Sequence, residues 1–255
     1  MKTKREKEKS PQAGDLWMDA HAVMNGLKGL GDATLAQGLL RFFKTGPGEY
    51  GEGDRFLGIR VPVLRRHLVL CKVLPDADIP LLLASPWHEV RMFALLLWVE
   101  RYKHGDARLR EAIFNAYLAH TKRVNNWDLV DLSAPVLVGW HLEHGNREIL
   151  YRLASSTLLW DRRIALVSTL TRIRKGDFED ALNLAALAAE DREPLMHKAA
   201  GWMLREVGKK DRRVLEAFLG PACRTLPRVL LRYSIEHFSP EERKAYLSGN
   251  PPCRI

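Results

Sequence analysis

The stretch RIALVSTLTRIRKGD (163–177) decides the class of fold, because it has the pattern of an apolar helix that ends in a basic turn followed by Gly and Asp. The same pattern recurs in FALLLWVERYKHGD (93–106) and in AAGWMLREVGKKD (199–211). Basic residues at the end of a helix also suit the helix dipole, which is a purely structural explanation for them. A pattern that returns along the chain nevertheless predicts a repeat architecture.

Helix-like segments fill most of the chain around these stretches, and short breaks at Gly or Pro separate them. No segment shows sustained period-two alternation, so no strand is expected. Short helices paired at a spacing of about forty residues predict an all-α fold, an α-solenoid of HEAT-like antiparallel helix pairs with a concave basic face. The expected helices lie near residues 15–30, 32–45, 62–73, 77–84, 86–103, 107–121, 125–143, 146–154, 159–175, 178–189, 192–208, 211–218, 225–235 and 240–247.

The chain of 255 residues is long enough for a sizeable core, and 46% of its residues are hydrophobic. No shift in composition divides it, so we expect one folded domain over residues 15–248. A lysine-rich arm (1–14) precedes this domain and is expected to be disordered, and a flexible tail (249–255) follows it. The glycine-rich segment GPGEYGEGD (46–54) is expected to be flexible.

The formal net charge of +9 indicates a polyanionic partner. Cys71, Cys223 and Cys253 are odd in number and lack CxxC spacing, which favours a reducing compartment and no metal site. The charged N-terminus is not a secretory signal, and no apolar run is long enough to span a bilayer. We therefore expect a soluble cytoplasmic protein, with a monomer as the default state.

The stretch RVNNWDLVDLSAPVLVGWHLEH (123–144) contains the first candidate site. In a helix, Trp127 and Asp131 share one stripe, and Pro135 has no N–H to give to the Asp131 carbonyl, which predicts a kink at the carboxylate. An indole beside a carboxylate suits a flat, positively charged group. The alternative is a capped helix with a solvated Asp131 and a half-buried Trp127. The residues expected to form the buried seam are Leu129, Leu132 and Val136.

The helix near 192–208 contains a second aromatic residue, on a basic face. The residues of this face, at spacings of four, three and four, are Lys198, Trp202, Arg205 and Lys209. The expected core face is Met196, Ala199, Met203 and Val207, although burial is the usual fate of an indole. In the helix near 159–175, Arg163 follows Trp160 by one turn and could reach either a phosphate or the Asp131 carboxylate. Stacked as inner helices, these elements predict a groove with phosphate-binding cations, two indoles and one acid.

Other possible sites are less specific. LKGLGD (27–32) resembles a helix-hairpin-helix phosphate loop, but two glycines between helices usually form a simple turn. His141 and His144 lack a third ligand and an HExxH motif, which favours a surface pair over a zinc site. The chain has no Walker loop, GxSxG, GxGxxG or HxE with PCxxC, so nothing in it supports nucleotide hydrolysis or zinc deamination.

Five strings in this order and spacing carry a resemblance to a known family: FLGIRVP (56–62), NNWDLVD (125–131), WDRRIAL (160–166), KAAGWMLREVGK (198–209) and LRYSIEHF (231–238). The chain resembles the AlkD-type DNA alkylation repair family, the HEAT-like-repeat alkylpurine DNA glycosylases, from about residue 15 to 240. The glycine-rich loop at 46–54 matches least well.

The resemblance implies a role for several of these residues. Asp131 is the implied catalytic carboxylate, and Trp127 and Trp202 are the implied aromatic contacts to the lesion or its sugar. Arg163 is implied to engage DNA beside the lesion. The residues that complete the expected DNA-binding set are Lys198, Arg205 and Lys209, from the basic face described above.

The implied activity is that of a monofunctional glycosylase acting on N3- or N7-alkylated purines in duplex DNA and leaving an abasic site, without metal or organic cofactor. The matching site string has no lysine that would form a Schiff base. Two other functions stay open. A non-catalytic solenoid that binds damaged or distorted DNA would bind without releasing a base, and a protein scaffold would present an apolar concave face.

Overall fold

The computed structural model describes residues 16–143 and 145–251. Within these residues the regular structure is helical, apart from an isolated β-bridge between Arg55 and Trp87. The expected all-α helical-repeat fold is confirmed, while the concave basic face stays a prediction. The expected arm at 1–14 and residues 252–255 of the expected tail lie outside the described residues.

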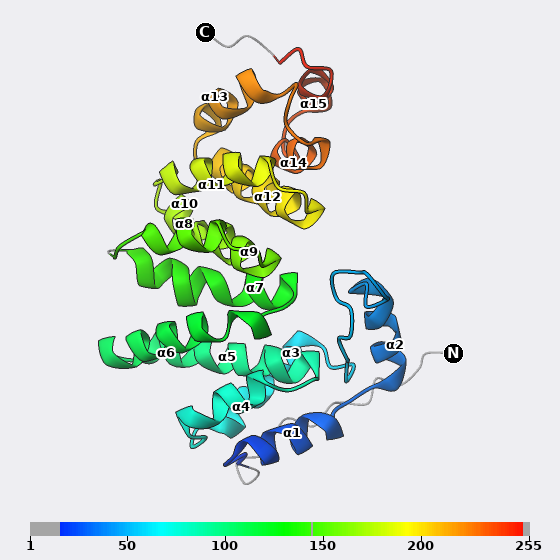
Figure 1. Cartoon of the computed structure of the whole chain (residues 1–255), viewed down its shortest axis with the longest axis vertical. Coiled ribbons are helices and arrows are strands. Elements are labelled where there is room, and N and C mark those ends of the chain that lie inside the picture. The colour runs from blue at the N-terminus through cyan, green and yellow to red at the C-terminus, as the bar shows by residue number, and fades with distance from the viewer. Residues whose placement is uncertain (1–15, 144, 252–255) are drawn as a thin grey trace. The chain divides into compact units, whose positions relative to one another are not determined.

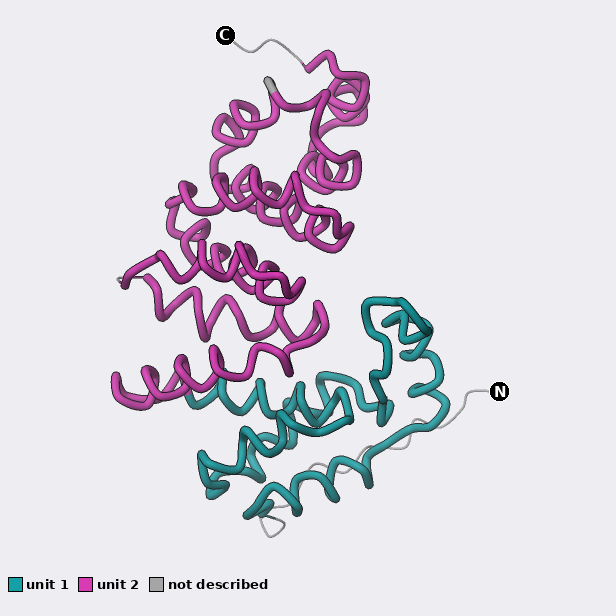
Figure 2. The backbone as a smooth tube through the Cα atoms, viewed as in Figure 1, with its two compact units in different colours: residues 1–101 teal, residues 102–255 magenta. Residues whose placement is uncertain are grey.

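The chain forms two compact units, residues 1–101 and 102–255, and the division falls inside helix α5 (His88–His104) (Figure 2). The single domain over 15–248 stays a prediction. None of the described helices is both long and apolar enough to cross a membrane.

Unit 1 contains the N-terminal helices and most of α5. Its elements are α1 (Ala20–Gly29), α2 (Ala33–Phe42), α3 (Val61–His67), α4 (Ile79–Leu83) and the 3-10 turns η1 (Leu68–Cys71) and η2 (Asp76–Asp78). Helix α1 begins later than expected because the side chain of Asp19 caps it, accepting from the Ala22 N–H at 2.7 Å. The fully buried residues of unit 1 include Val23, Leu27, Leu64, Ile79, Leu82 and Phe93.

Unit 2 continues the series of short helices (Figure 1). Its α-helices are α6 (Ala107–Ala119), α7 (Trp127–Ala134), α8 (Glu148–Ala154), α9 (Leu159–Ser168), α10 (Leu170–Arg174), α11 (Glu179–Ala189), α12 (Pro194–Lys210), α13 (Arg212–Ala222), α14 (Arg228–Ser234) and α15 (Pro240–Leu247). Its other elements are the 3-10 turns η3 (Thr121–Arg123) and η5 (His141–Glu143) and the π-helical segment η4 (Pro135–Trp140). Helix α8 packs on α9, α11 packs on α12, and α9 contacts both α7 and α12. The helices that carry the candidate site residues are therefore successive neighbours.

The recurring Asp of the three repeat stretches has a local explanation in each case. Asp106 and Asp211 are the N-caps of α6 and α13, with side chains that accept from the backbone N–H groups of the first turn. Asp177 instead pairs with Arg172 of α10. The expected helix at 159–175 is divided into α9 and α10 at Thr169, whose hydroxyl donates to the Leu166 carbonyl at 2.7 Å. The expected core face of α12 is confirmed, since Met196, Ala199, Met203 and Val207 are all buried.

Candidate functional site

Helix α7 begins at a buried cap and places two site residues one turn apart. The Asn126 side chain accepts from the Trp127 N–H at 2.9 Å and is itself fully buried. Asp131 follows Trp127 by four residues, so both side chains lie on the same face of the helix. Both are partly exposed, whereas Leu129 between them is buried.

After Ala134 the helix does not end but widens into a π-helical segment, η4. Pro135 keeps helical dihedral angles (φ −60°, ψ −32°), yet its ring nitrogen cannot donate to the Asp131 carbonyl. The single helix expected over 125–143 is therefore wrong, since this stretch divides into α7, η4 and η5. The change of helix type begins at Pro135, four residues after Asp131, rather than at the carboxylate itself. π-Helical turns inside α-helices are frequent at functional sites.

The expected seam of α7 is partly wrong. Leu129 is fully buried, but Leu132 and Val136 are only half-buried. The buried residues of this stretch also include Val130, Ser133, Ala134, Leu137 and Val138. The reason is that α7 and η4 pack against α9 as well as against α6 and α10, so two adjoining stripes are covered rather than one.

The π-helical segment is held from outside by α9 and α10. The Thr171 hydroxyl donates to the Pro135 carbonyl at 2.7 Å. Gly139 allows a close approach, because a Cβ at this position would lie 2.4 Å from the Ser168 carbonyl oxygen. From the other side, the Ser133 hydroxyl donates to the Leu129 carbonyl at 2.6 Å and lies 3.0 Å from the buried Tyr117 hydroxyl. The backbone beside Asp131 is therefore fixed on both sides.

Asp131 and Arg163 form a two-point ion pair. Arg163 Nε donates to Asp131 Oδ1 at 3.0 Å, and Nη2 donates to Oδ2 at 2.9 Å. The remaining Nη1 donates to the Leu195 carbonyl at 2.8 Å, in the first turn of α12. The Arg163 side chain is 6% exposed and the Asp131 side chain 20%. The guanidinium therefore lies behind the carboxylate, which keeps an open side.

The electrostatics of Asp131 reflect this position. Burial raises the pKa of the Asp131 carboxyl above its ordinary value, and the neighbouring Asp128 carboxylate adds to the shift. The charge and hydrogen bonds of Arg163 act in the opposite direction. A poorly hydrated carboxylate interacts strongly with any cation that reaches its open side, because little water screens the interaction.

The other expected site residues lie on α12 and have mixed surroundings. Trp202 is half-buried and Lys198 is exposed. Arg205 is paired with Glu236, which follows α14, and Lys209 donates to Glu206 at 2.8 Å. Arg163 links α12 to Asp131 through the Leu195 carbonyl, two turns before Trp202 along the same helix.

Sequence reasoning missed three partners of the site. The Leu195 carbonyl is a main-chain group, so no residue type could have signalled it. Glu236 belongs to the string LRYSIEHF, but its pairing with Arg205 depends on how α14 packs against α12. Thr171 had no signal of its own, since it belongs to the apolar repeat stretch.

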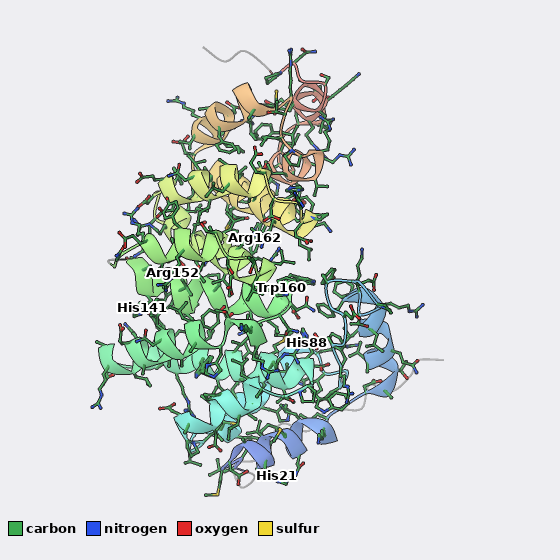
Figure 3. All side chains as sticks on the ribbon, in the orientation of Figure 1. His21, His88, His141, Arg152, Trp160 and Arg162 are labelled. Carbon is green, nitrogen blue, oxygen red and sulfur yellow. The ribbon has the colours of Figure 1, made fainter. Side chains whose placement is uncertain are left out.

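The residues around Arg163 on α9 are also engaged. Trp160 and Arg162 are labelled in Figure 3. Arg162 donates to Asp191 at 2.6 and 3.2 Å and to the carbonyls of Ser156 and Thr157. These contacts join the start of α9 to the loop before α12, which holds the helix that presents Arg163.

The side chain of His141 contacts other side chains of unit 2 through both ring nitrogens and the ring face. Its Nδ1 lies 3.2 Å from the Tyr102 hydroxyl, its Nε2 lies 3.1 Å from Glu111 Oε2, and its ring stacks on Phe114. His144, its expected neighbour, lies outside the described residues. Over residues 16–143 and 145–251, no group of three or more His, Cys, Asp or Glu side chains is arranged to hold a metal ion.

Comparison with known proteins agrees with the arrangement of helices. The chain is similar to a solved structure described as "Predicted DNA alkylation repair enzyme from Enterococcus faecalis", with a TM-score of 0.60 and 17% identity, covering 82% of this chain and 97% of that chain. At this identity the likeness shows a shared fold. No curated protein matches the chain. The family model described as DNA alkylation repair enzyme matches residues 23–238, most of the chain. The chain therefore belongs to the family of DNA alkylation repair enzymes, and its role lies in DNA repair.

Proposed function

We propose that this protein is a monofunctional DNA glycosylase that hydrolyses the N-glycosidic bond of N3- or N7-alkylated purines in duplex DNA. The observation that carries the proposal is the Asp131 carboxylate, which is partly exposed, held at both oxygens by the buried Arg163, and one helical turn from Trp127. The proposed partner is double-stranded DNA, bound by a monomer, and the product is an abasic site.

The chemistry requires little more than a placed carboxylate. An alkylated purine with a formal positive charge is already a good leaving group, so the general acid that neutral glycosides need is dispensable. The remaining tasks are to stabilise an oxocarbenium-like sugar and to orient a water molecule. Each Asp131 oxygen accepts one N–H from Arg163, and its second lone pair is left for these tasks.

Selectivity for a charged lesion is assigned to the two indoles. The faces of Trp127 and Trp202 attract cations, which favours a cationic base or sugar over an ordinary nucleotide. Both side chains are partly exposed, as such contacts require. Lys198, Arg205 and Lys209 are proposed to bind phosphates, which gives little sequence preference and strong salt dependence.

The test is release of 7-methylguanine and 3-methyladenine from duplex DNA by wild type and by Asp131→Asn. Asparagine keeps the shape and one acceptor for Arg163 but removes the charge. We expect the single-turnover rate to fall roughly a hundredfold or more, the scale of an electrostatic catalytic group, with DNA binding little changed. If folded wild type binds DNA and releases neither base, the glycosylase is rejected in favour of a non-catalytic DNA-binding protein.

A further inference from the structure

Unit 1 contains a short segment that is held far more firmly than a connecting loop requires. This anchored segment, residues 54–60, joins the glycine-rich loop to α3. The Glu89 carboxylate, 2% exposed, accepts three consecutive backbone N–H groups, from Leu57 at 2.8 Å, Gly58 at 2.8 Å and Ile59 at 3.1 Å. The hydrogen bonds of this buried carboxylate thus fix the backbone of these three residues.

The start of the anchored segment has a second buried acid. Asp54 Oδ2 lies 2.8 Å from His88 Nδ1, and Asp54 Oδ1 accepts from Arg91 Nη2 at 2.6 Å. His88, labelled in Figure 3, also donates its backbone N–H to the Arg55 carbonyl at 2.8 Å. Burial alone would raise the pKa of Asp54, but the hydrogen bonds and charges of His88 and Arg91 lower it overall, so the carboxylate stays ionised.

The middle of the anchored segment packs against α2. The Asp32 N–H donates to the Leu57 carbonyl at 2.9 Å. Gly58 has φ +82°, and a Cβ there would lie 2.0 Å from the Asp32 carbonyl oxygen, so only glycine fits. Hydrogen bonds or close packing therefore fix the segment at its start and in its middle.

Two arginines flank the residues that are fixed in this way. Phe56, Leu57, Gly58 and Ile59 are buried, whereas Arg55 before them and Arg60 after them are exposed. Within residues 16–143 and 145–251, neither arginine is paired with a carboxylate. The acids that precede Arg55 in sequence have other partners: Asp54 is paired with His88 and Arg91, Glu49 accepts from Gly46 N–H, and Glu52 accepts from Gly48 N–H.

We propose that the anchored segment is a phosphate clamp, in which Arg55 and Arg60 each bind a phosphate of the DNA backbone. A guanidinium matches a phosphate with two parallel N–H donors, and a backbone that is already fixed loses little entropy on binding. The clamp positions the duplex and reads no sequence. The clamp rests on the proposed function only in taking DNA as its partner. It does not depend on the chemistry at Asp131.

The first experiment measures binding of undamaged duplex DNA by the full chain between roughly 50 and 200 mM salt. Each lost phosphate contact makes the slope of log K against log salt shallower by about 0.9, so Arg55→Gln and Arg60→Gln should each show this change and the double variant about twice it. Lys72→Gln removes the same charge from an exposed position outside the segment and should leave the slope unchanged. Arginine variants with the slope of wild type overturn the clamp.

A second variant separates placement of the arginines from net charge. Glu89→Gln removes one negative charge, so a purely electrostatic effect would tighten binding. Loss of the anchor should instead weaken it by roughly fivefold at low salt, the scale of one phosphate contact. A folded Glu89→Gln that binds at least as tightly as wild type rejects the anchoring. If circular dichroism shows that this variant is unfolded, the arginine variants decide alone.

The two proposals fail in different ways. Binding of undamaged DNA does not depend on base release, so a wild type that releases no methylated base counts against the glycosylase and not against the clamp. Conversely, arginine variants that bind like wild type, with base release intact, remove the clamp and leave the glycosylase.

Discussion

At Asp131, burial disfavours the charge of the carboxylate while the neighbouring guanidinium favours it. Each of the two side chains depends on the other for its hydrogen bonds, because Arg163 is buried and donates two N–H groups to the Asp131 carboxylate. We therefore expect the Asp131–Arg163 ion pair to affect the pH at which the proposed reaction loses activity.

The sign of that dependence follows from the pKa of Asp131. The carboxylate is the active form, so activity is retained above this pKa and lost as the pH falls through it. Because burial raises the pKa, the loss begins at a higher pH than for an ordinary aspartate. Arg163→Gln removes the main cause that lowers the pKa, so the loss should begin at a still higher pH.

The measurement is the single-turnover rate of 7-methylguanine release from neutral to acidic pH, with spontaneous base loss subtracted. An unchanged profile in Arg163→Gln would mean that Arg163 does not set the ionisation of Asp131. Asp131→Asn is the matched control, since its residual rate should not follow this profile.

Residue types and helical spacing predicted part of this site. The four-residue spacing of Trp127 and Asp131 required only local geometry, and Arg163 was expected to reach either a phosphate or Asp131. The third contact of Arg163, to the Leu195 carbonyl, requires α9 and α12 to pack together, and no residue type encodes it.

At the scale of the element, the π-helical segment η4 shows how a local rule combines with tertiary packing. Pro135 predicts that the helix is disturbed, but not that it continues in a wider turn. In the folded protein, Thr171 donates to the Pro135 carbonyl of this wider turn, and Gly139 lets η4 approach α9. The sequence therefore predicted that the helix is interrupted near Pro135, but not that it continues as a π-helical segment.

Gly139 and Gly38 provide a test of this packing. A Cβ at Gly139 would meet the Ser168 carbonyl at 2.4 Å, whereas a Cβ at Gly38 in α2 would meet nothing within 4 Å. Gly139→Ala should destabilise the protein by about 1–3 kcal/mol, as overpacking does. Gly38→Ala should stabilise it by roughly 0.5–1 kcal/mol, because alanine favours a helix. Urea unfolding measures both, and equal effects would contradict the packing described for η4.

At the scale of the whole molecule, the total of 40 lysines and arginines overstates the number of cations available to DNA. Arg91, Arg162, Arg163 and Arg172 are all paired with aspartates inside the fold. Composition predicted the sign of the partner's charge. It could not predict which arginines form ion pairs within the protein, because those pairs depend on contacts between distant segments.

Arg205 is the clearest intermediate case, since its partner Glu236 is half exposed. Glu236→Gln should leave Arg205 with only its longer ion pair, Nε to Glu206 Oε1 at 3.6 Å, and tighten binding of duplex DNA by a few-fold, about one phosphate contact. Glu190→Gln changes the net charge equally at an exposed position after α11 and should have a smaller effect. Equal effects of the two variants would show that total charge, rather than the release of Arg205, controls binding.

The contact between Arg163 and the Leu195 carbonyl has an evolutionary consequence. Every amino acid supplies a main-chain carbonyl, so residue 195 can drift among side chains that suit α12 while the contact to Arg163 persists. Related proteins can therefore share this part of the site without sharing the residue. A search for the site by matching side chains would pass over it, whereas a comparison of backbone paths around α9 and α12 would find it.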